Sequence, residues 1–154
     1  MALGERFEIN WVNVEPKKAR ESAQKKRAAL FHRGEGIWFF DGDVYFTATA
    51  YDQLFKLTPK ENGGQVELIA KDLSSPDNIT VAPWGDIIVA EDQSGYCRLR
   101  LVRKNGEVSS FAQNAIGFGQ EFAGVCFSPD GKTLFCNLQK SGHTIAIRGP
   151  FESV

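Results

Sequence analysis

Acidic residues recur along this chain, each placed a few residues before a turn that closes on glycine. Glu35, Asp77 and Glu121 precede the segments DGDVYFTATA, WGDIIVAED and DGKTLFCNL, in which large apolar residues alternate after the turn. Converging carboxylates repel one another unless a cation lies among them, and hard oxygen ligands suit Ca²⁺, Mn²⁺ or Fe³⁺. If the fold brings these three acids together, the sequence predicts a metal site.

Other polar residues accompany these acids. Glu91 and Asp92 end a predicted strand in VAEDQ, and we expect them at the same end of the fold as the three acids. Glycines on both sides of Glu35 allow close backbone approach, and Arg33 beside them supplies a bidentate donor for an anion. The alternative is that the acids are ordinary turn and cap residues, since Asp77-Asn78 after a proline is good turn chemistry.

The elements that would position these residues follow from a repeat. The turn glycines Gly42, Gly85 and Gly131 are 43 and 46 residues apart, with about four predicted strands in each interval. A period of about 40–50 residues with four strands is typical of β-propeller blades, whose innermost strands line a central channel. The sequence therefore predicts an all-β fold, a partial β-propeller of about three four-stranded antiparallel blades over residues 32–154.

Three blades are fewer than the roughly four to eight that close a propeller. We therefore expect an open arc, which is either part of a larger propeller or completed by association. Each blade would contribute one of the three acids at an equivalent point, so that all three face a common axis. Alternating patterns and turn residues predict the strands: 36–40, 43–50, 53–58, 65–71, 77–82, 86–91, 96–103, 107–112, 122–127, 133–138 and 143–148.

Residues 1–31 precede the repeats and have a different pattern. Residues 6–14 alternate as in a strand, and the region near 17–30 is rich in helix-forming residues with few apolar ones, which predicts a surface helix. Its basic residues are interpreted as a solvated helix face, because no aromatic residues interleave and the net charge is −1. We therefore expect neither a nucleic-acid nor a membrane partner.

Cysteine and histidine residues give no sign of a zinc site, because no HxH, HExxH or paired Cys/His spacing occurs. Cys97, Cys126 and Cys136 each lie in an apolar run and are interpreted as buried free thiols. Cys126 and Cys136 flank one hairpin, so a disulfide between them stays open. No export signal or apolar run of membrane-spanning length is present, which predicts a cytoplasmic location for the chain as given.

Three segments together resemble the PhoX alkaline phosphatase family. They contain RGEGIW, PDNITVAPWG followed by ED, and EFAGVCFSPDG, in this order, and the resemblance covers roughly 31–151. The SPDGKTLF piece alone is weak, since many propellers carry it. The resemblance implies a secreted or periplasmic, calcium-dependent phosphomonoesterase on a six-bladed propeller, with calcium and iron ions at the channel mouth.

The resemblance also assigns roles to individual residues. Glu35 and Asp77 match expected metal ligands, and Glu91 and Glu121 match two further acidic motifs of the family. Arg33 matches the arginine expected to hold phosphate, and Asn78 and Asp92 lie beside the matching acids.

Members of the family are several times longer and carry more ligands, including a cysteine, in an upstream half that is not found here. We therefore expect a C-terminal part of a PhoX-like enzyme, inactive alone, that associates with the missing half or with itself. Two alternatives are a catalytically silent binding or structural remnant and a gluconolactonase-like metal-dependent hydrolase.

Overall fold

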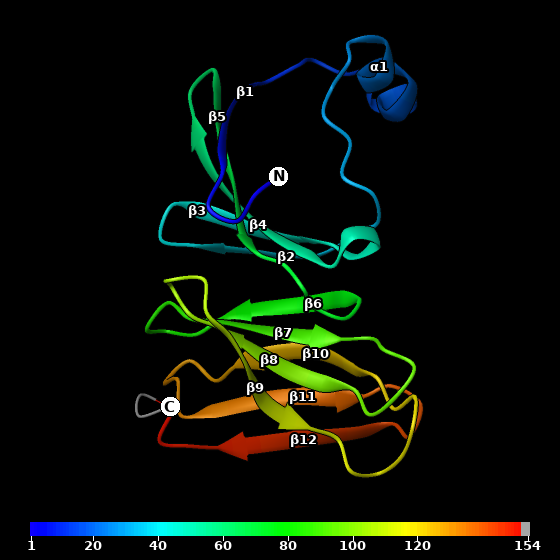
Figure 1. Cartoon of the computed structure of the whole chain (residues 1–154), viewed down its shortest axis with the longest axis vertical. Coiled ribbons are helices and arrows are strands. Elements are labelled where there is room, and N and C mark those ends of the chain that lie inside the picture. The colour runs from blue at the N-terminus through cyan, green and yellow to red at the C-terminus, as the bar shows by residue number, and fades with distance from the viewer. Residues whose placement is uncertain (152–154) are drawn as a thin grey trace.

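Antiparallel sheets stacked along the long axis make up most of the molecule (Figure 1). The computed structural model describes residues 1–151. Three sheets of five, four and three strands follow one another along the chain, and each inner strand lies beside that of the next sheet. This arrangement confirms the predicted partial propeller.

The sheets form three blades whose strands pair in chain order from the inner strand outward. Blade 1 has the order β2-β3-β4-β5, with β1 added beside β5 as a fifth, outer strand. Blades 2 and 3 have the orders β6-β7-β8-β9 and β10-β11-β12. The strand bounds are: β1 Arg6–Asn10, β2 Gly34–Phe40, β3 Asp43–Ala48, β4 Gln53–Lys60, β5 Gly63–Ala70, β6 Pro76–Val81, β7 Ile87–Glu91, β8 Arg98–Val102, β9 Val108–Gln113, β10 Phe122–Phe127, β11 Thr133–Leu138 and β12 His143–Arg148.

Helical structure is shorter than the sequence predicts. The 3-10 turn η1 (Pro16–Lys18) leads into α1 (Ala19–Lys25), and a second 3-10 turn, η2 (Thr49–Tyr51), links β3 to β4. The expected helix near 17–30 was too long at its C-terminal end, where Arg27 has a positive φ of 53° that a helix does not accommodate. The first strand is also shorter than the expected 6–14.

The N-terminal strand β1 approaches β5 at a pair of glycines. Asn10 pairs with Gly63 and Ile9 with Gly64, inside the ladder. A Cβ atom added at Gly63 would lie 2.0 Å from the carbonyl oxygen of Ile9. Glycine at this position therefore allows β1 to join blade 1, because any side chain would collide with its backbone.

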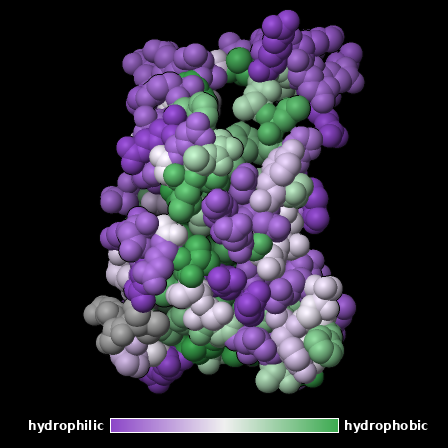
Figure 2. All heavy atoms as spheres, viewed as in Figure 1, coloured by the Kyte–Doolittle hydropathy of each residue, from purple (hydrophilic) through white to green (hydrophobic). Residues whose placement is uncertain are grey.

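Apolar cores lie between the blades. One cluster, which includes Ile79 and Val89, joins blade 1 to blade 2, and another, which includes Leu99 and Leu134, joins blade 2 to blade 3. A smaller cluster around Phe55 and Leu68 lies on the face of blade 1 that is turned away from blade 2. Figure 2 shows apolar side chains reaching the surface in patches between hydrophilic ones.

Each innermost strand carries a bulge near its start. The pairing register shifts between Gly34 and Ile37 in β2, between Pro76 and Ile79 in β6, and between Ala123 and Cys126 in β10. A bulge bends the strand and redirects its side chains. The same device therefore recurs at the same end of all three blades.

All three cysteines are free. Cys126 pairs across the ladder with Phe135, and Cys136 is the next residue along β11. Because successive strand residues point to opposite faces, Cys126 and Cys136 lie on opposite faces of blade 3, and the disulfide that the sequence left open does not form.

Among residues 1–151, no helix combines the length and the apolar character needed to cross a bilayer.

Candidate functional site

A small polar pocket of about 190 Å³ lies where the inner strands of the blades begin. Four acids line it: Glu35 from β2, Asp77 from β6, Asp92 after β7 and Glu121 before β10. Arg33 and Thr49 complete the lining. We call this site the acidic pocket, and it gathers the three acids that the sequence repeat singled out.

Backbone contacts between blades 1 and 2 fix the positions of Glu35 and Asp77. A Cβ atom at Gly36 would lie 2.4 Å from the carbonyl oxygen of Asp77, so only glycine lets the two bulges approach. The Thr47 hydroxyl accepts the Gly36 N–H at 2.9 Å and donates to the Asp77 carbonyl oxygen at 3.1 Å. The Thr49 hydroxyl donates to the Pro76 carbonyl oxygen at 2.6 Å.

Blades 2 and 3 are joined in a similar way. The Asn78 Oδ1 atom accepts the Val125 N–H at 2.8 Å, inside the bulge of β10. Asn78 therefore links two blades and is not among the residues that line the acidic pocket. The sequence predicts that Glu35, Asp77 and Glu121 occupy equivalent positions in the three blades. In the bulges, however, the residue of blade 3 that matches Glu35 and Asp77 is Gly124. Glu121 reaches the pocket from just before β10.

The electrostatics of the pocket are dominated by like charges. Burial raises the pKa of Glu121 to about 7, and a side-chain hydrogen bond with Asp77 and the negative charges of Asp92 and Asp77 raise it in the same direction. Lys140 opposes the shift. A carboxyl group in this position favours a proton or a metal cation as its neighbour, because either relieves the repulsion.

Arg33 provides a positive charge in the acidic pocket. Its Nη2 atom lies 3.4 Å from Glu35 Oε1, and its side chain is 63% exposed. The backbone of Arg33 has a φ of 53°, and its carbonyl oxygen accepts the Thr49 N–H. The guanidinium therefore has free donors at the edge of the pocket, where an anion could approach.

Glu91 does not line the acidic pocket. Its carboxylate is fully buried, lies 3.2 Å from Arg98 Nε and 3.3 Å from Arg100 Nη1, and accepts the Ser74 N–H at 2.8 Å. The sequence predicts that Glu91 is a metal ligand. In the structure, both oxygens of its carboxylate already contact an arginine or a backbone N–H. Its contacts hold the segment that leads into Asp77.

Sequence reasoning missed three residues at this site. Thr49 lines the pocket from η2, the Gln139 carboxamide faces the Glu121 carboxylate, and Lys140 is close enough to lower the Glu121 pKa. No local pattern marks these residues, because their positions depend on which strands pair.

The family model named "Alkaline phosphatase PhoX" matches residues 58–142, which is more than half of the chain. The chain belongs to the PhoX alkaline phosphatase family. The match includes Asp77, Asp92 and Glu121, whereas Arg33 and Glu35 precede it. Among curated protein sequences, no significant match was found.

Solved structures with a similar fold are propeller-like enzymes of low sequence identity. Virginiamycin B lyase from Staphylococcus aureus has a TM-score of 0.53 at 12% identity, over 95% of this chain and 46% of that chain. A streptogramin B lyase has a TM-score of 0.55 at 14% identity, over 95% and 45%. A putative 6-phosphogluconolactonase from Bacteroides uniformis has a TM-score of 0.60 at 13% identity, over 92% and 42%. The chain thus spans less than half the length of these three structures.

The donor set of the acidic pocket fits the metals that PhoX membership suggests. Four carboxylates and a threonine hydroxyl are hard oxygen donors of the kind that Ca²⁺ and Fe³⁺ prefer. In residues 1–151, however, no group of three Asp, Glu, His or Cys side chains is arranged to hold a metal ion. The chemistry of the donors fits, and the side chains would have to close in further to coordinate an ion.

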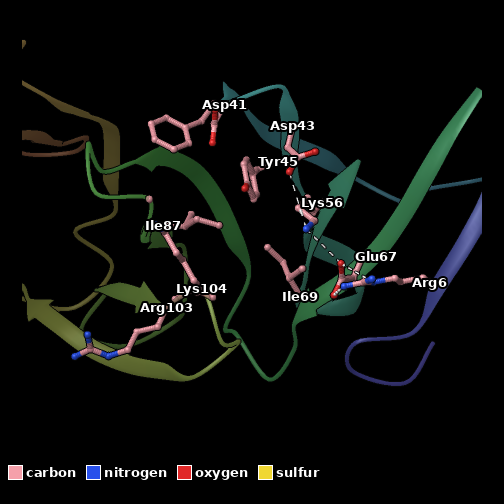
Figure 3. A pocket seen from close by; sticks show the side chains of 13 residues that line it. Arg6, Asp41, Asp43, Tyr45, Lys56, Glu67, Ile69, Ile87, Arg103 and Lys104 are labelled. Atoms are coloured by element: carbon pink, nitrogen blue, oxygen red, sulfur yellow. Dashed lines mark hydrogen bonds and ion pairs between the residues drawn. The ribbon is translucent and has the colours of Figure 1, made fainter. Parts of the chain in front are cut away.

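A larger cleft of about 350 Å³ opens at the opposite end of the strands, between blades 1 and 2 (Figure 3). Four of its charged side chains form ion pairs with one another. Glu67 lies 3.1 Å from Arg6 and 3.4 Å from Lys56, and Lys56 lies 4.0 Å from Asp43. These four charges of the cleft are paired, whereas the smaller acidic pocket gathers four carboxylates around a single arginine.

Proposed function

We propose that this PhoX-family chain carries part of the active site of a metal-dependent phosphomonoesterase, centred on the acidic pocket. The observation that carries the proposal is the convergence of four acids and Arg33, from three successive blades, in one pocket. Family membership supports the same reaction class, since the matching model describes an alkaline phosphatase.

The residues of the pocket have distinct roles in this proposal. Glu35, Asp77 and Glu121 would hold Ca²⁺ or Fe³⁺, with Asp92 as a further oxygen donor. When bound, these cations would neutralise the phosphate oxygens and the charge that develops as the ester bond breaks. Arg33 would bind the phosphate through paired N–H donors at the exposed edge of the pocket.

Other residues act by holding this arrangement in place. Glu91 fixes the segment before Asp77 through the Ser74 N–H, and Asn78 fixes the bulge of blade 3 through the Val125 N–H. We assign both of them a positioning role and no direct contact with metal or substrate.

We further propose that the chain is inactive alone, with 32–154 as the propeller part and 1–31 as an N-terminal addition to it. The chain spans less than half the length of the three similar structures named above, and about three blades are fewer than close a propeller. Each missing ligand would leave cation charge uncompensated and geometry loose. The remaining blades would come from an upstream half or from a second copy.

A catalytically silent remnant is the second candidate, and a lactonase-like hydrolase the third. The retained acids argue against a remnant, because packing four carboxylates together costs stability that a purely structural role does not require. The likeness to the putative 6-phosphogluconolactonase is a likeness of fold at 13% identity and carries no chemistry.

The test measures metal binding and catalysis separately. Calorimetry with Ca²⁺ and Fe³⁺ should detect binding to the chain that is weakened at least tenfold in Glu35→Gln and Asp77→Asn, while Glu61→Gln, an exposed acid at the far end of blade 1, leaves it unchanged. Hydrolysis of p-nitrophenyl phosphate should stay near background without the missing blades. Equal metal binding by all variants would refute the proposed site.

A further inference from the structure

Two loops beside the acidic pocket carry exposed apolar side chains that the proposed function does not use. Residues 92–97 join β7 to β8, and residues 114–121 join β9 to β10. Tyr96, Ile116 and Phe118 are 39%, 59% and 71% exposed, and we call the two rings, Tyr96 and Phe118, the aromatic rim. The Tyr96 and Phe118 ring centroids are 4.5 Å apart. A contacting pair of exposed rings among polar residues is a candidate binding surface.

The aromatic rim adjoins the acidic pocket. Asp92 begins the first loop and Glu121 ends the second, and both acids line the pocket. The Gly119 N–H donates to the Gly95 carbonyl oxygen at 3.0 Å, which joins the two loops next to the rim residues. The rim therefore lies on the same end of the molecule as the pocket, a few residues away on each loop.

The second loop is held in shape by a buried amide. Asn114 is only 4% exposed, its Nδ2 atom donates to the Gln120 carbonyl oxygen at 2.9 Å, and its Oδ1 atom accepts the Ile116 N–H at 3.0 Å. The Gln93 side chain donates to the Tyr96 carbonyl oxygen in the first loop. The rim is thus presented by organised loops, which lowers the entropy cost of binding a ligand.

Completion of the propeller would leave the aromatic rim accessible to a ligand. Tyr96 belongs to blade 2, and Phe118 lies in the connection from blade 2 to blade 3. Blade 2 already has a neighbour on each side, so additional blades would pack beyond blades 1 and 3. The rim therefore needs an explanation other than a missing blade.

We propose that the aromatic rim binds the organic part of the substrate and that this part is an aromatic ring. This inference rests on the proposed function, because the phosphate of the same molecule would lie in the acidic pocket with Arg33. A planar ring stacks on the Tyr96–Phe118 pair, whereas a small alkyl group gains little contact there. The chain would thus favour aryl phosphomonoesters over small alkyl ones.

The test compares binding of phenylphosphonate and methylphosphonate, which are not hydrolysed as phosphate esters. Both are titrated into the ¹⁵N-labelled full chain in the presence of Ca²⁺, which is diamagnetic and leaves nearby resonances sharp, and are followed by the backbone amide resonances of Gly95 and Gly119. Phenylphosphonate should bind about three- to tenfold more tightly, as expected for one aromatic contact. Phe118→Ala and Tyr96→Ala should bring this ratio close to one and leave methylphosphonate binding unchanged.

Two controls separate the possible failures. Phe39→Ala removes an equally exposed ring on β2 and should leave the ratio unchanged, whereas Arg33→Ala should weaken both phosphonates. If both phosphonates bind through Arg33 but the rim variants keep the wild-type ratio, the inference about the rim is wrong and the proposed function stands. If neither phosphonate binds, both the proposed function and the inference about the rim are wrong.

Discussion

At the scale of single residues, the raised pKa of the Glu121 carboxyl group makes the stability of the folded chain depend on pH. Its pKa in the folded protein is about 7, above the ordinary glutamate value of 4.5, because of burial and the nearby acids. The contribution of the protonated carboxyl to the free energy of unfolding is therefore fully present below about pH 4.5. It is lost as the pH rises through about 7, where the folded protein has to give up the proton.

We predict that Glu121→Gln makes the metal-free protein more stable than the wild type at pH 8 by on the order of 1 kcal/mol, a value reduced for solvent screening, and no more stable at pH 4. Urea unfolding at both pH values with a chelator present measures the difference. Glu61→Gln, at the far end of the molecule, is the control. The same difference at both pH values would show that the Glu121 pKa is not raised.

Gly36 is the residue where a single methyl group should do most harm. Its Cβ would meet backbone atoms at Asp77 and Ile79, at 2.4 and 2.9 Å, and backbone cannot move aside as a flexible side chain can. Gly36→Ala should lower the free energy of unfolding by about 1–3 kcal/mol or more. Gly95→Ala, which meets no atom within 4 Å, should change it by less than about 0.5 kcal/mol. Equal effects in thermal unfolding would contradict the close contact between blades.

At the scale of elements, the contact between β6 and β10 depends on one side chain. Asn78→Ala leaves the Val125 N–H without its acceptor, which should cost about 1–3 kcal/mol. Asn105→Ala removes a similar bond, from the Glu107 N–H, in an exposed turn where water replaces the acceptor, and should cost less. Hydrogen exchange of the Val125 amide should speed up in the first variant only. Unchanged exchange there would rule out the link between the blades.

The strands themselves could largely be predicted from the sequence, whereas the strands and side chains that they contact at long range could not. Alternation and turn glycines are local signals, so most strands and the three blades followed from the sequence. The placement of β1 beside β5 depends on contacts between residues about 57 positions apart, such as Glu8 with Gln65, which leave no local pattern. The ion pairs of Glu91 depend in the same way on strand β8.

The candidate site was predictable to a similar degree. Repetition indicated that Glu35, Asp77 and Glu121 would meet, and the structure brings them into one pocket. Repetition could not show that Glu91 turns toward Arg98 and Arg100, because the adjacent Asp92 has the same charge and a similar side chain. Which of two neighbouring acids faces the pocket is decided by the pleat of β7.

At the scale of the whole molecule, the open arc leaves apolar side chains on its end faces. Ile37 and Phe39 on β2 are each 67% exposed, on the face of blade 1 that has no neighbouring blade. We predict concentration-dependent association in sedimentation experiments, which Ile37→Lys and Phe39→Lys together should reduce. Tyr51→Lys, at another exposed aromatic, is the control. A compact monomer at high concentration would contradict this prediction.

The addition of β1 to blade 1 has a consequence for the order in which the chain folds. Blades 2 and 3 are built from hairpins between strands adjacent in the chain, whereas β1 must wait for β5. During synthesis β1 therefore stays unpaired until some sixty more residues have followed, since its ladder runs from Arg6–Glu67 to Asn10–Gly63. Pairing across a long loop forms more slowly than pairing of neighbours. Strand β1 is thus the last strand of blade 1 to acquire its partner, and for that interval its backbone groups are open to other chains.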